Sequence, residues 1–519
     1  MATQPVIPGV DDPVVDQVVT APPEGTPPVS LRGFAVMGLV ASAVIVCGVV
    51  LGGTAFMSRL PGAWFFGTPG GPLGSLGPNG SRPSIVAVLA VYGGVGMLAI
   101  TWVRLLHTLW HRPGVAVRRV VGVVTAWAVP ILLAPPLFSR DVYSYAGQGE
   151  LASHNINPYS YGPEVLGFTS FSTLPDSVWL DSITPYGPTF VGIDGVLDQA
   201  SGHHILPDIL LLRLLEVGGL AMIVAGTPTL ARSLKRDPAE AVLMGAGSPL
   251  VLVTLIGGAH NDALMLGFLV AGLAVARRVG PVPGVVLCAL AAGVKSPAFL
   301  GVIFIGWLWA GVGATVWRRV AYAGLASAIG LATLEAVTVA TGLSWGWLLA
   351  VTTSASSFTG VTPVSFVSRL VSDVAGVVGL HLAVLSLHNV FSVLGLCIAG
   401  LIGLRLLWTS PERGLVRNLG LALLVLALLG PVVWAWYVTW GIVVLAPAAA
   451  GRLRGAVIAI ITYWTVVGAA KITTLSKTLG HAGALQDLVL ITSLAAVAIV
   501  PLGLYYRRHD RGPALTSNP

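Results

Sequence analysis

The sequence predicts an all-α protein that crosses a membrane many times. Hydrophobic residues make up 55% of the 519-residue chain and charged residues only 9%, and the mean hydropathy is +0.86. Ordinary soluble domains carry about 25% charged residues. Long apolar runs recur along the chain, and about 17 to 25 apolar residues suffice for one crossing. The 64 glycines fit this class because small residues let membrane helices approach closely.

Fourteen apolar segments are candidate helices, and about 13–14 are expected to be transmembrane. They cover residues 34–57, 85–106, 120–138, 206–227, 241–257, 262–276, 282–294, 298–316, 320–341, 383–407, 418–434, 437–450, 455–470 and 485–506. Several are short for a full crossing. The pairs 241–257 with 262–276 and 282–294 with 298–316 have tight connections, so we expect re-entrant, tilted or buried helices there.

The basic residues separate the two sides of this predicted bundle. With the N-terminus inside, 20 of the 28 Lys and Arg residues fall on the cytoplasmic face and seven on the other, and Arg213 lies within a span. The seven are Arg59, Arg82, Arg140, Lys295, Arg369, Lys471 and Lys477. Because cytoplasmic loops collect positive charge, this split predicts a multi-pass protein of the cell (plasma) membrane with both termini in the cytoplasm. The net charge of +7 is therefore a topology signal and not a surface for nucleic acid.

The chain divides into two tails and one membrane domain. Residues 1–31 are rich in Pro, Val, Asp and Thr and lack the regions of a signal peptide, so we expect a disordered cytoplasmic tail. Residues 32–507 form the polytopic domain, with 139–205 as its first large extracytoplasmic loop and 342–382 as a second outer segment. Residues 508–519 form a cytoplasmic C-terminal tail. The three cysteines lie far apart in apolar segments and predict neither disulfides nor a metal site.

A polar, aromatic stretch begins at Ser139, where a long apolar run ends. Its Asp141 lies between Arg140 and two tyrosines, Tyr143 and Tyr145. A carboxylate at the edge of a membrane loses solvation, so a simple spacer would more often carry Ser, Gly or Asn. The alternative is that Ser139 or Asp141 caps a helix that begins here.

The outer loop is expected to contain two helices, over 142–153 and 183–200, that lie in the membrane interface. Aromatic residues of this loop are then expected at the level of the lipid headgroups. They are Tyr143, Tyr145, Tyr159, Tyr161, Trp179 and Tyr186. Rigid turns at Asn157-Pro158-Tyr159 and Thr184-Pro185-Tyr186-Gly187-Pro188 connect the helices.

Two further polar groups lie on the same predicted face. His260, Asn261 and Asp262 stand where two apolar segments meet, and helix capping by Asn261 or Asp262 leaves His260 unexplained. Lys295 ends a short apolar segment and is followed by Ser296. A flexible ammonium next to a hydroxyl and a helix N-terminus suits a phosphate, whereas the alternative is a lysine that extends to the membrane surface.

Two other features have both a structural and a functional interpretation. Arg213 stands inside a span with Glu216 one turn later, which fits an internal ion pair or a second phosphate contact. Trp434, Trp436, Tyr437 and Trp440 form an aromatic cluster at an outer boundary. Such a cluster is either an aromatic belt at the membrane surface or a surface that stacks on a sugar.

Together these residues suit glycosyl transfer from a lipid phosphate. Asp141 is the expected general base for an acceptor hydroxyl, and Lys295, Ser296 and Arg213 the expected ligands of the leaving phosphate. A phosphate monoester needs less metal assistance than a diphosphate, and the outer loops show no DxD-like cluster, so we expect no metal and no other cofactor. The expected substrate-binding residues are Arg140, Tyr143, Tyr145, Tyr159, Tyr186, His260, Asn261, Asp262, Trp434, Trp436 and Tyr437.

The sequence also resembles a known family in an ordered set of motifs. They are Phe138-Ser139-Arg140-Asp141-Val142-Tyr143-Ser144-Tyr145-Ala146-Gly147-Gln148-Gly149, Asn157-Pro158-Tyr159, Thr184-Pro185-Tyr186-Gly187-Pro188, Gly257-Gly258-Ala259-His260-Asn261-Asp262 and Val294-Lys295. In this order they resemble the actinobacterial α-(1→6)-mannopyranosyltransferases of lipomannan and lipoarabinomannan biosynthesis. An ordered set of this kind is more specific than any single motif.

The resemblance implies the GT-C membrane glycosyltransferase fold. It implies polyprenyl-phosphate mannose as donor and a mannosylated lipid, phosphatidylinositol mannoside or lipomannan, as acceptor, with membrane lipids as further partners. It also implies an inverting transfer from a β-linked donor to the 6-OH of an α-(1→6)-mannan, with Asp141 as base, on the extracytoplasmic face. A GT-C enzyme that uses polyprenyl-phosphate arabinose or glucose is the first alternative. A lipid or sugar transporter is the second, and it has only Arg213, Glu216 and Glu335 as charges at mid-depth.

Overall fold

The computed structural model describes residues 29–52, 85–354 and 363–466, and these residues form helices and their connections without a β-strand. The predicted all-α class is therefore confirmed. The last candidate helix, 485–506, lies outside the described residues, as do the C-terminal tail 508–519 and nearly all of the N-terminal tail 1–31.

The helices fall into a bundle and a set of shorter outer elements. The bundle contains α1 (Arg32–Gly52), α2 (Ile85–His111), α3 (Val117–Leu133), α7 (Ile205–Ser233), α8 (Pro238–Met244), α9 (Pro249–Val251), η4 (Leu252–Gly257), α10 (Asp262–Arg278), α11 (Pro281–Ala292), η5 (Ser296–Ala298), α12 (Phe299–Trp309), α13 (Val316–Thr341), α16 (Val384–Trp408), α17 (Ser410–Arg413), α18 (Leu415–Leu429), α19 (Val438–Leu445), η6 (Ala446–Ala448) and α20 (Gly451–Trp464). The outer elements are α4 (Asp141–Ser153), η2 (Pro163–Leu166), α5 (Ser170–Thr173), η3 (Ser177–Trp179), α6 (Pro188–Ser201), α14 (Trp347–Ser354) and α15 (Pro363–Val377).

Five of the described helices are long and apolar enough to cross a membrane: α1, α2, α7, α13 and α16. The segments 238–244 and 249–257 pass the same test together but meet at a bend of 44°. The remaining candidate segments within the described residues form shorter helices, as expected for the pairs with tight connections. They include α10, whose 17 residues are mostly buried. A helix surrounded by protein does not need the length that a lipid-exposed crossing requires.

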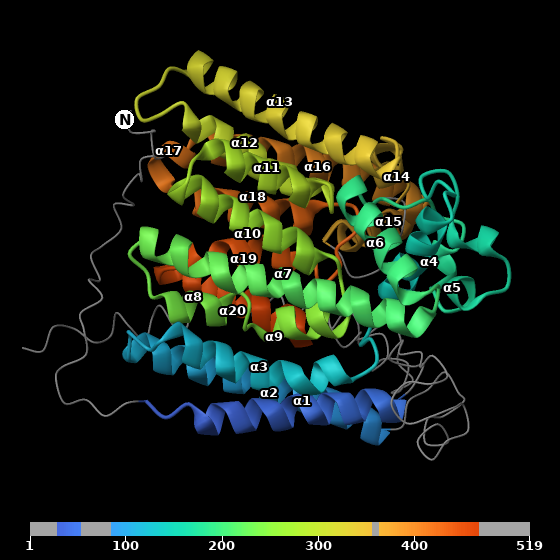
Figure 1. The fold of residues 1–519 in the computed structure, drawn as a ribbon, viewed down its shortest axis with the longest axis horizontal. Helices are drawn as coiled ribbons and strands as arrows, with labels where there is room; N and C mark the ends of the chain where they lie inside the picture. Colours follow the sequence, from blue (N-terminus) through green and yellow to red (C-terminus); the bar gives the residue numbers. More distant parts are fainter. Residues whose placement is uncertain (1–28, 53–84, 355–362, 467–519) are drawn as a thin grey trace, which may run out of the picture.

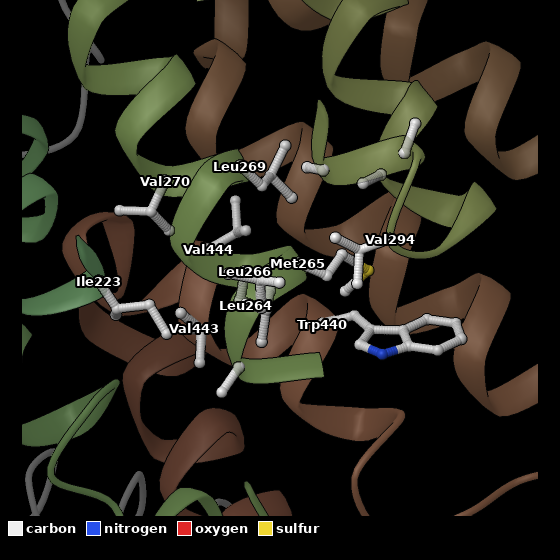
Figure 2. Packing of buried hydrophobic residues seen from close by; sticks show 14 of the residues in the cluster. Ile223, Leu264, Met265, Leu266, Leu269, Val270, Val294, Trp440, Val443 and Val444 are labelled. Carbon is white, nitrogen blue, oxygen red and sulfur yellow. The ribbon is translucent and has the colours of Figure 1, made fainter. Parts of the chain in front are cut away.

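Buried apolar residues form two main clusters that hold the bundle together. One cluster joins the first three helices to α8, α9, α19 and α20, and the other joins α4, α6 and α7 to α10, α11 and α12. Figure 2 shows part of the second cluster, where Leu264, Leu266 and Leu269 of α10 meet Val443 and Val444 of α19. Trp440 lies at the edge of this packing, next to Val294 (Figure 2).

The ends of the bundle differ in character. Figure 1 shows α4, α5, α6, α14 and α15 gathered at one end, whereas α17 and the turn between α12 and α13 lie at the opposite end. The first end carries the two segments predicted as extracytoplasmic, 139–205 and 342–382, as far as they are described. The second end carries Arg318, Arg319 and Arg413, which belong to the predicted cytoplasmic set.

One expectation about the outer loop is wrong. Helices α4 and α6 form almost over the predicted ranges, but the rings of Tyr143 and Tyr145 are fully buried in the protein rather than at headgroup level. They are buried because eight consecutive residues of α4, from Val142 to Gly149, are covered by neighbouring elements. Tyr161, by contrast, is 53% exposed.

Candidate active site

Asp141 is the first residue of α4, at the point where the chain turns out of the bundle. Arg140 precedes it as the N-cap residue, and the main-chain N–H of Asp141 donates to Oγ of Ser139 at 3.2 Å. The side chain of Asp141 is 17% exposed. The positive end of a helix dipole favours a carboxylate at this position. Asp141 is therefore a largely buried carboxyl group at the start of a helix.

His260 faces this carboxylate from the turn between η4 and α10. Its Nε2 lies 3.5 Å from Oδ2 of Asp141, and its Nδ1 lies 2.7 Å from the main-chain oxygen of Thr254. Thr254 belongs to η4, a π-helical turn of the kind often found at functional sites. The π-helical turn thus provides the oxygen that fixes the orientation of the imidazole.

The contacts of His260 define where a proton can reside. A carbonyl oxygen only accepts hydrogen bonds, so Nδ1 must carry a hydrogen, and Nε2 is the nitrogen that faces Asp141. Nε2 is buried and has no hydrogen-bond partner among the described residues. A proton placed between Nε2 and the carboxylate would turn the 3.5 Å approach into a charge-assisted hydrogen bond. Nε2 of His260 is thus the ring nitrogen that faces the carboxylate.

Asp262 and Lys295 form a buried ion pair. Nζ of Lys295 lies 3.1 and 3.0 Å from the two carboxylate oxygens of Asp262, and Nε1 of Trp440 donates to the same carboxylate. Asp262 is fully buried and Lys295 is 8% exposed. The alternative that Lys295 extends to the membrane surface is thus wrong. Burial of two charges is tolerated because each satisfies the other.

Aromatic rings from the connection between α18 and α19 cover both charged pairs. Trp436 stacks on His260 with ring centroids 3.8 Å apart, and Trp434 stacks on Trp436 at 5.1 Å. Tyr437 lies beneath Lys295, with Nζ 4.5 Å from the ring centroid. Trp436 and Trp440 are 7% and 5% exposed, so these rings wall an internal site instead of forming a belt at the membrane surface.

Tyr186 and Tyr145 close the opposite wall. Their ring centroids are 5.2 Å apart, and the Tyr186 ring lies 5.5 Å from Nζ of Lys295. Burial, followed by the charge of Asp141, raises the pKa of the Tyr186 hydroxyl well above its usual value, with a smaller contribution from Asp262. The pKa of the Tyr145 hydroxyl is also raised, first by burial and then by Tyr186 and the same two carboxylates. The carboxylates thus share one aromatic-walled space, and both hydroxyls stay protonated as hydrogen-bond donors.

The Tyr186 turn is held against the Lys295 segment by two glycines. The N–H groups of Thr189 and Phe190, at the start of α6, donate to the main-chain oxygen of Gly293 at 3.0 and 3.2 Å. A Cβ added to Gly187 would lie 2.6 Å from that oxygen. Only glycine permits this approach, so the turn and the lysine segment pack backbone to backbone.

Arg213 lies behind the site and binds the ends of two helices. Its guanidinium donates to the main-chain oxygens of Ile131, Leu132, Ala134 and Gly257. Glu216 accepts the N–H of Leu264 at 3.1 Å, near the start of α10. These contacts give each residue a structural partner other than the one expected from their spacing. They also fix the helix ends that precede Asp141 and His260.

The remaining predicted residues divide between the site and its surroundings. Asn261 lies between His260 and Asp262, is fully buried, and has no hydrogen-bond partner for either amide atom among the described residues. Ser296 opens η5 directly after Lys295. Tyr159 instead packs with Val191 and Trp347, where the two outer segments meet. Trp440, predicted only as a member of the aromatic cluster, belongs to the site because it donates to Asp262.

A carboxylate–histidine pair, a buried lysine and stacked aromatic rings, all at one end of an all-α membrane bundle, fit a membrane glycosyltransferase. Comparison with known families agrees. Residues 35–311 match the model described as alpha-(1->6)-mannopyranosyltransferase, N-terminal domain, and residues 362–505 match the MptB C-terminal domain. The chain belongs to the alpha-(1->6)-mannopyranosyltransferase family.

Individual relatives cover most of the chain. A probable alpha-(1->6)-mannopyranosyltransferase of Mycolicibacterium smegmatis is 30% identical over 84% of this chain and 83% of the relative. Alpha-(1->6)-mannopyranosyltransferase A of Mycobacterium tuberculosis is 29% identical, with 74% and 75% covered, and alpha-(1->6)-mannopyranosyltransferase B of Corynebacterium glutamicum is 29% identical, with 70% and 66% covered. No solved structure matches the chain.

Proposed function

We propose that this protein transfers mannose from polyprenyl-phosphate mannose to the 6-OH of a lipid-linked α-(1→6)-mannan. The observation that supports it most is that Asp141 and Nε2 of His260 face each other in the aromatic space that also contains Lys295. The names of the relatives support the sugar and the linkage. The donor lipid, the acceptor and the stereochemical course are our assignment.

In the proposed reaction the acceptor oxygen attacks the anomeric carbon of mannose from the face opposite the phosphate. The new C1–O bond forms while the C1–O bond to phosphate breaks, and the phosphate leaves with the electron pair as a lipid phosphate monoester. A β-linked donor therefore gives an α-linked product. Asp141 removes the proton of the acceptor 6-OH as the bond forms, as a general base placed within reach of that hydroxyl.

His260 assists Asp141 by sharing the proton. Because Nδ1 is bound to the main-chain oxygen of Thr254, the nitrogen that receives the proton is Nε2. The resulting imidazolium would be stabilised by the face of Trp436, which lies 3.8 Å from it, through a cation–π interaction. The proton can thus leave the acceptor without making Asp141 its final carrier.

Lys295 neutralises the leaving phosphate. An ammonium group has three N–H donors, and the two oxygens of Asp262 engage two of them. The third can bind a phosphate oxygen, with the hydroxyl of the adjacent Ser296 as a further donor. Asp262 also prevents a net buried positive charge before the donor binds. We assign Arg213 a positioning role because its guanidinium binds helix ends.

The sugars are recognised by the polar and aromatic groups around this pair. The amide of Asn261, buried without a partner, offers a donor and an acceptor to sugar hydroxyls. Trp434 and Trp436 provide flat faces, and Tyr186 provides a hydroxyl. By the charge distribution along the chain, we place this site on the extracytoplasmic side of the plasma membrane.

The test is transfer of radiolabelled mannose from polyprenyl-phosphate mannose to a synthetic α-(1→6)-mannoside by the purified protein in detergent. Asp141→Asn keeps the size of the side chain and should lower the rate by about 10²–10⁴-fold, the range for loss of a general base. Asp181→Asn, at an exposed aspartate in the same loop, is the matched control. Circular dichroism and size-exclusion chromatography should be the same for all three proteins.

Near-normal turnover by Asp141→Asn would show that Asp141 is not the general base. Transfer from a polyprenyl-phosphate arabinose or glucose, but not from the mannose donor, would keep the site and change the sugar. A β-linked product would exclude the inverting course.

A further inference from the structure

A second group of histidine and carboxylate side chains lies at the far end of α4, remote from Asp141. It consists of Glu150, His154, Asp198 and His203, and one potential ligand atom from each lies within 4.8 Å of the others. The members come from the last turn of α4, the last turn of α6 and the turn that follows it. None of them contributes to the proposed transfer chemistry.

The side chains of this group lie close enough together to converge on one ion, and its two shortest contacts are hydrogen bonds of His203. Nδ1 of His203 lies 2.7 Å from Oδ2 of Asp198 and 3.1 Å from Oε2 of Glu150, and Nδ1 of His154 lies 3.7 Å from Oε1 of Glu150. Ligands of a tetrahedral zinc ion bind at about 2.0–2.2 Å and are therefore about 3.3–3.5 Å apart. Two of the observed distances are shorter than that spacing and one is longer, and Nδ1 of His154 also lies 2.9 Å from the main-chain oxygen of Glu150. Binding an ion therefore requires the exposed rings of His154 and His203 to turn toward the carboxylates.

The burial of the group suits an ion that enters from one side. Asp198 is fully buried, and its Oδ1 has no hydrogen-bond partner among the described residues. The side chains of His154 and His203 are 49% and 43% exposed. The carboxylate of Asp198 thus lies at the buried base of the group, and the two imidazoles lie on its exposed side.

Two further acidic residues, Asp194 and Asp208, are buried next to the group. Asp194 and Asp208 are fully buried, interact electrostatically with Asp198, and have carboxylate oxygens without hydrogen-bond partners among the described residues. In the described part of the chain, Lys and Arg form no ion pair with any of these carboxylates. Burial favours the neutral form of these acids, and a divalent cation bound at Asp198 would favour their charged form.

We propose that Glu150, His154, Asp198 and His203 bind one zinc ion. Two imidazoles and two carboxylates suit Zn²⁺ better than Ca²⁺ or Mg²⁺, which prefer oxygen ligands. The ion replaces protons that the ring nitrogens and carboxylates otherwise share, so binding releases protons. The two carboxylates and the ion together carry no net charge.

The ion has a structural role. It connects the end of α4 to the end of α6, where Oγ of Ser153 already donates to Oδ2 of Asp198 at 2.6 Å. Gly195 of α6 packs directly on Ala152 of α4, so the two helices approach closely beside the group. Because α4 begins at Asp141 and α6 begins beside Tyr186, a link between their far ends limits the motion of the elements that carry the site.

The test measures metal content and thermal stability of the full chain, purified in detergent without a histidine tag. Protein treated with EDTA and desalted is titrated with ZnCl₂ or CaCl₂. Wild type should bind about one zinc per chain and unfold at a higher temperature with zinc, but not with calcium. Glu150→Gln and His203→Ala should bind zinc at least about tenfold more weakly and lose the temperature shift.

Two controls separate this site from other histidines. His204→Ala removes the exposed neighbour of His203, and His107→Ala/His111→Ala removes a pair one helical turn apart in α2. Both should keep zinc binding and the temperature shift. The absence of stoichiometric zinc, or binding that persists in His203→Ala and Glu150→Gln but disappears in the α2 double variant, would overturn the proposal. Neither readout depends on transfer activity, so the proposed function can fail or hold independently.

Discussion

An aspartate and a histidine approach each other beside each end of α4, and the second pair comes from α6 and the turn that follows it. At the first end, Asp141 faces His260 at 3.5 Å, and at the last end, Asp198 approaches His203 at 2.7 Å. The first pair is enclosed by tryptophan and tyrosine rings beside a lysine whose charge Asp262 balances. The second pair is open on the histidine side and is surrounded by further carboxylates. Because the Asp–His contact is common to both, we attribute the different chemistry proposed for each to the balance of charge around the pair and to the lone pairs that remain accessible.

Among variants that leave Asp141 in place, Lys295→Met should have the largest effect on transfer. Loss of the ammonium leaves Asp262 as an unpaired buried charge, which costs about 3–5 kcal/mol of stability. Transfer should fall by about 10²–10³-fold because the leaving phosphate loses its counter-charge. Thermal unfolding and the transfer assay measure the two losses.

The double variant Lys295→Met/Asp262→Asn distinguishes a role of Lys295 in stability from a role in transfer. Removal of both charges should restore most of the thermal stability but not the transfer. If activity returned together with stability, the lysine would serve the fold alone and the proposed contact with phosphate would be wrong.

His260→Asn should give the next largest effect. The Asn amide can replace Nδ1 as donor to the main-chain oxygen of Thr254, but it has no group equivalent to Nε2 facing Asp141. We expect kcat to fall by about 10–100-fold with little change in the KM for donor. A KM effect with unchanged kcat would instead show that His260 contacts substrate and does not share the proton.

Asn261→Leu should affect substrate binding more than stability. Replacement of a buried amide without a partner by an apolar side chain of similar size is close to neutral or stabilising for the unbound protein. Loss of a hydrogen bond to sugar should raise KM by about tenfold. A large drop in unfolding temperature would mean that the amide has a structural partner in solution.

Ser153→Ala should give the smallest effect on transfer, because it acts at the remote end of α4. It removes the hydrogen bond from Oγ of Ser153 to Asp198, and a bond to a charged group contributes about 1.5–3 kcal/mol. We expect a lower unfolding temperature and a change in kcat smaller than that of His260→Asn. If this variant reduced kcat more than His260→Asn, the two ends of α4 would be more tightly coupled than the comparison implies.

The helices could be predicted from sequence because apolar runs and their lengths reflect the thickness of a bilayer. The gathering of Asp141, His260, Asp262 and Lys295 at one end followed from counting alternate crossings. What the sequence could not show was which side chains pair. Lys295 binds Asp262, 33 residues earlier, because α10 and α11 pack side by side, and this packing depends on side-chain shape rather than on spacing.

The contacts of Arg213 and of the group around Asp198 could likewise not be predicted from the sequence. The i+3 spacing of Arg213 and Glu216 suggested a pair on one helix face, yet the long guanidinium reaches carbonyl groups about 80 residues away at the end of α3. The zinc-ligand candidates span residues 150–203 without a recognisable spacing motif, so only the approach of α4 to α6 reveals them. Tyr143 and Tyr145 were placed in the headgroup region because composition cannot distinguish a ring that faces lipid from one that faces protein.

The contact between Gly187 and Gly293 has a consequence for how the enzyme moves. Since the main chains of these two segments are joined by hydrogen bonds at the start of α6, Tyr186 and Lys295 must shift as one unit. If the proposed donor phosphate displaced the main chain at Lys295, the wall formed by Tyr186 would move with it, so the proposed donor and acceptor sites would be coupled through this backbone contact.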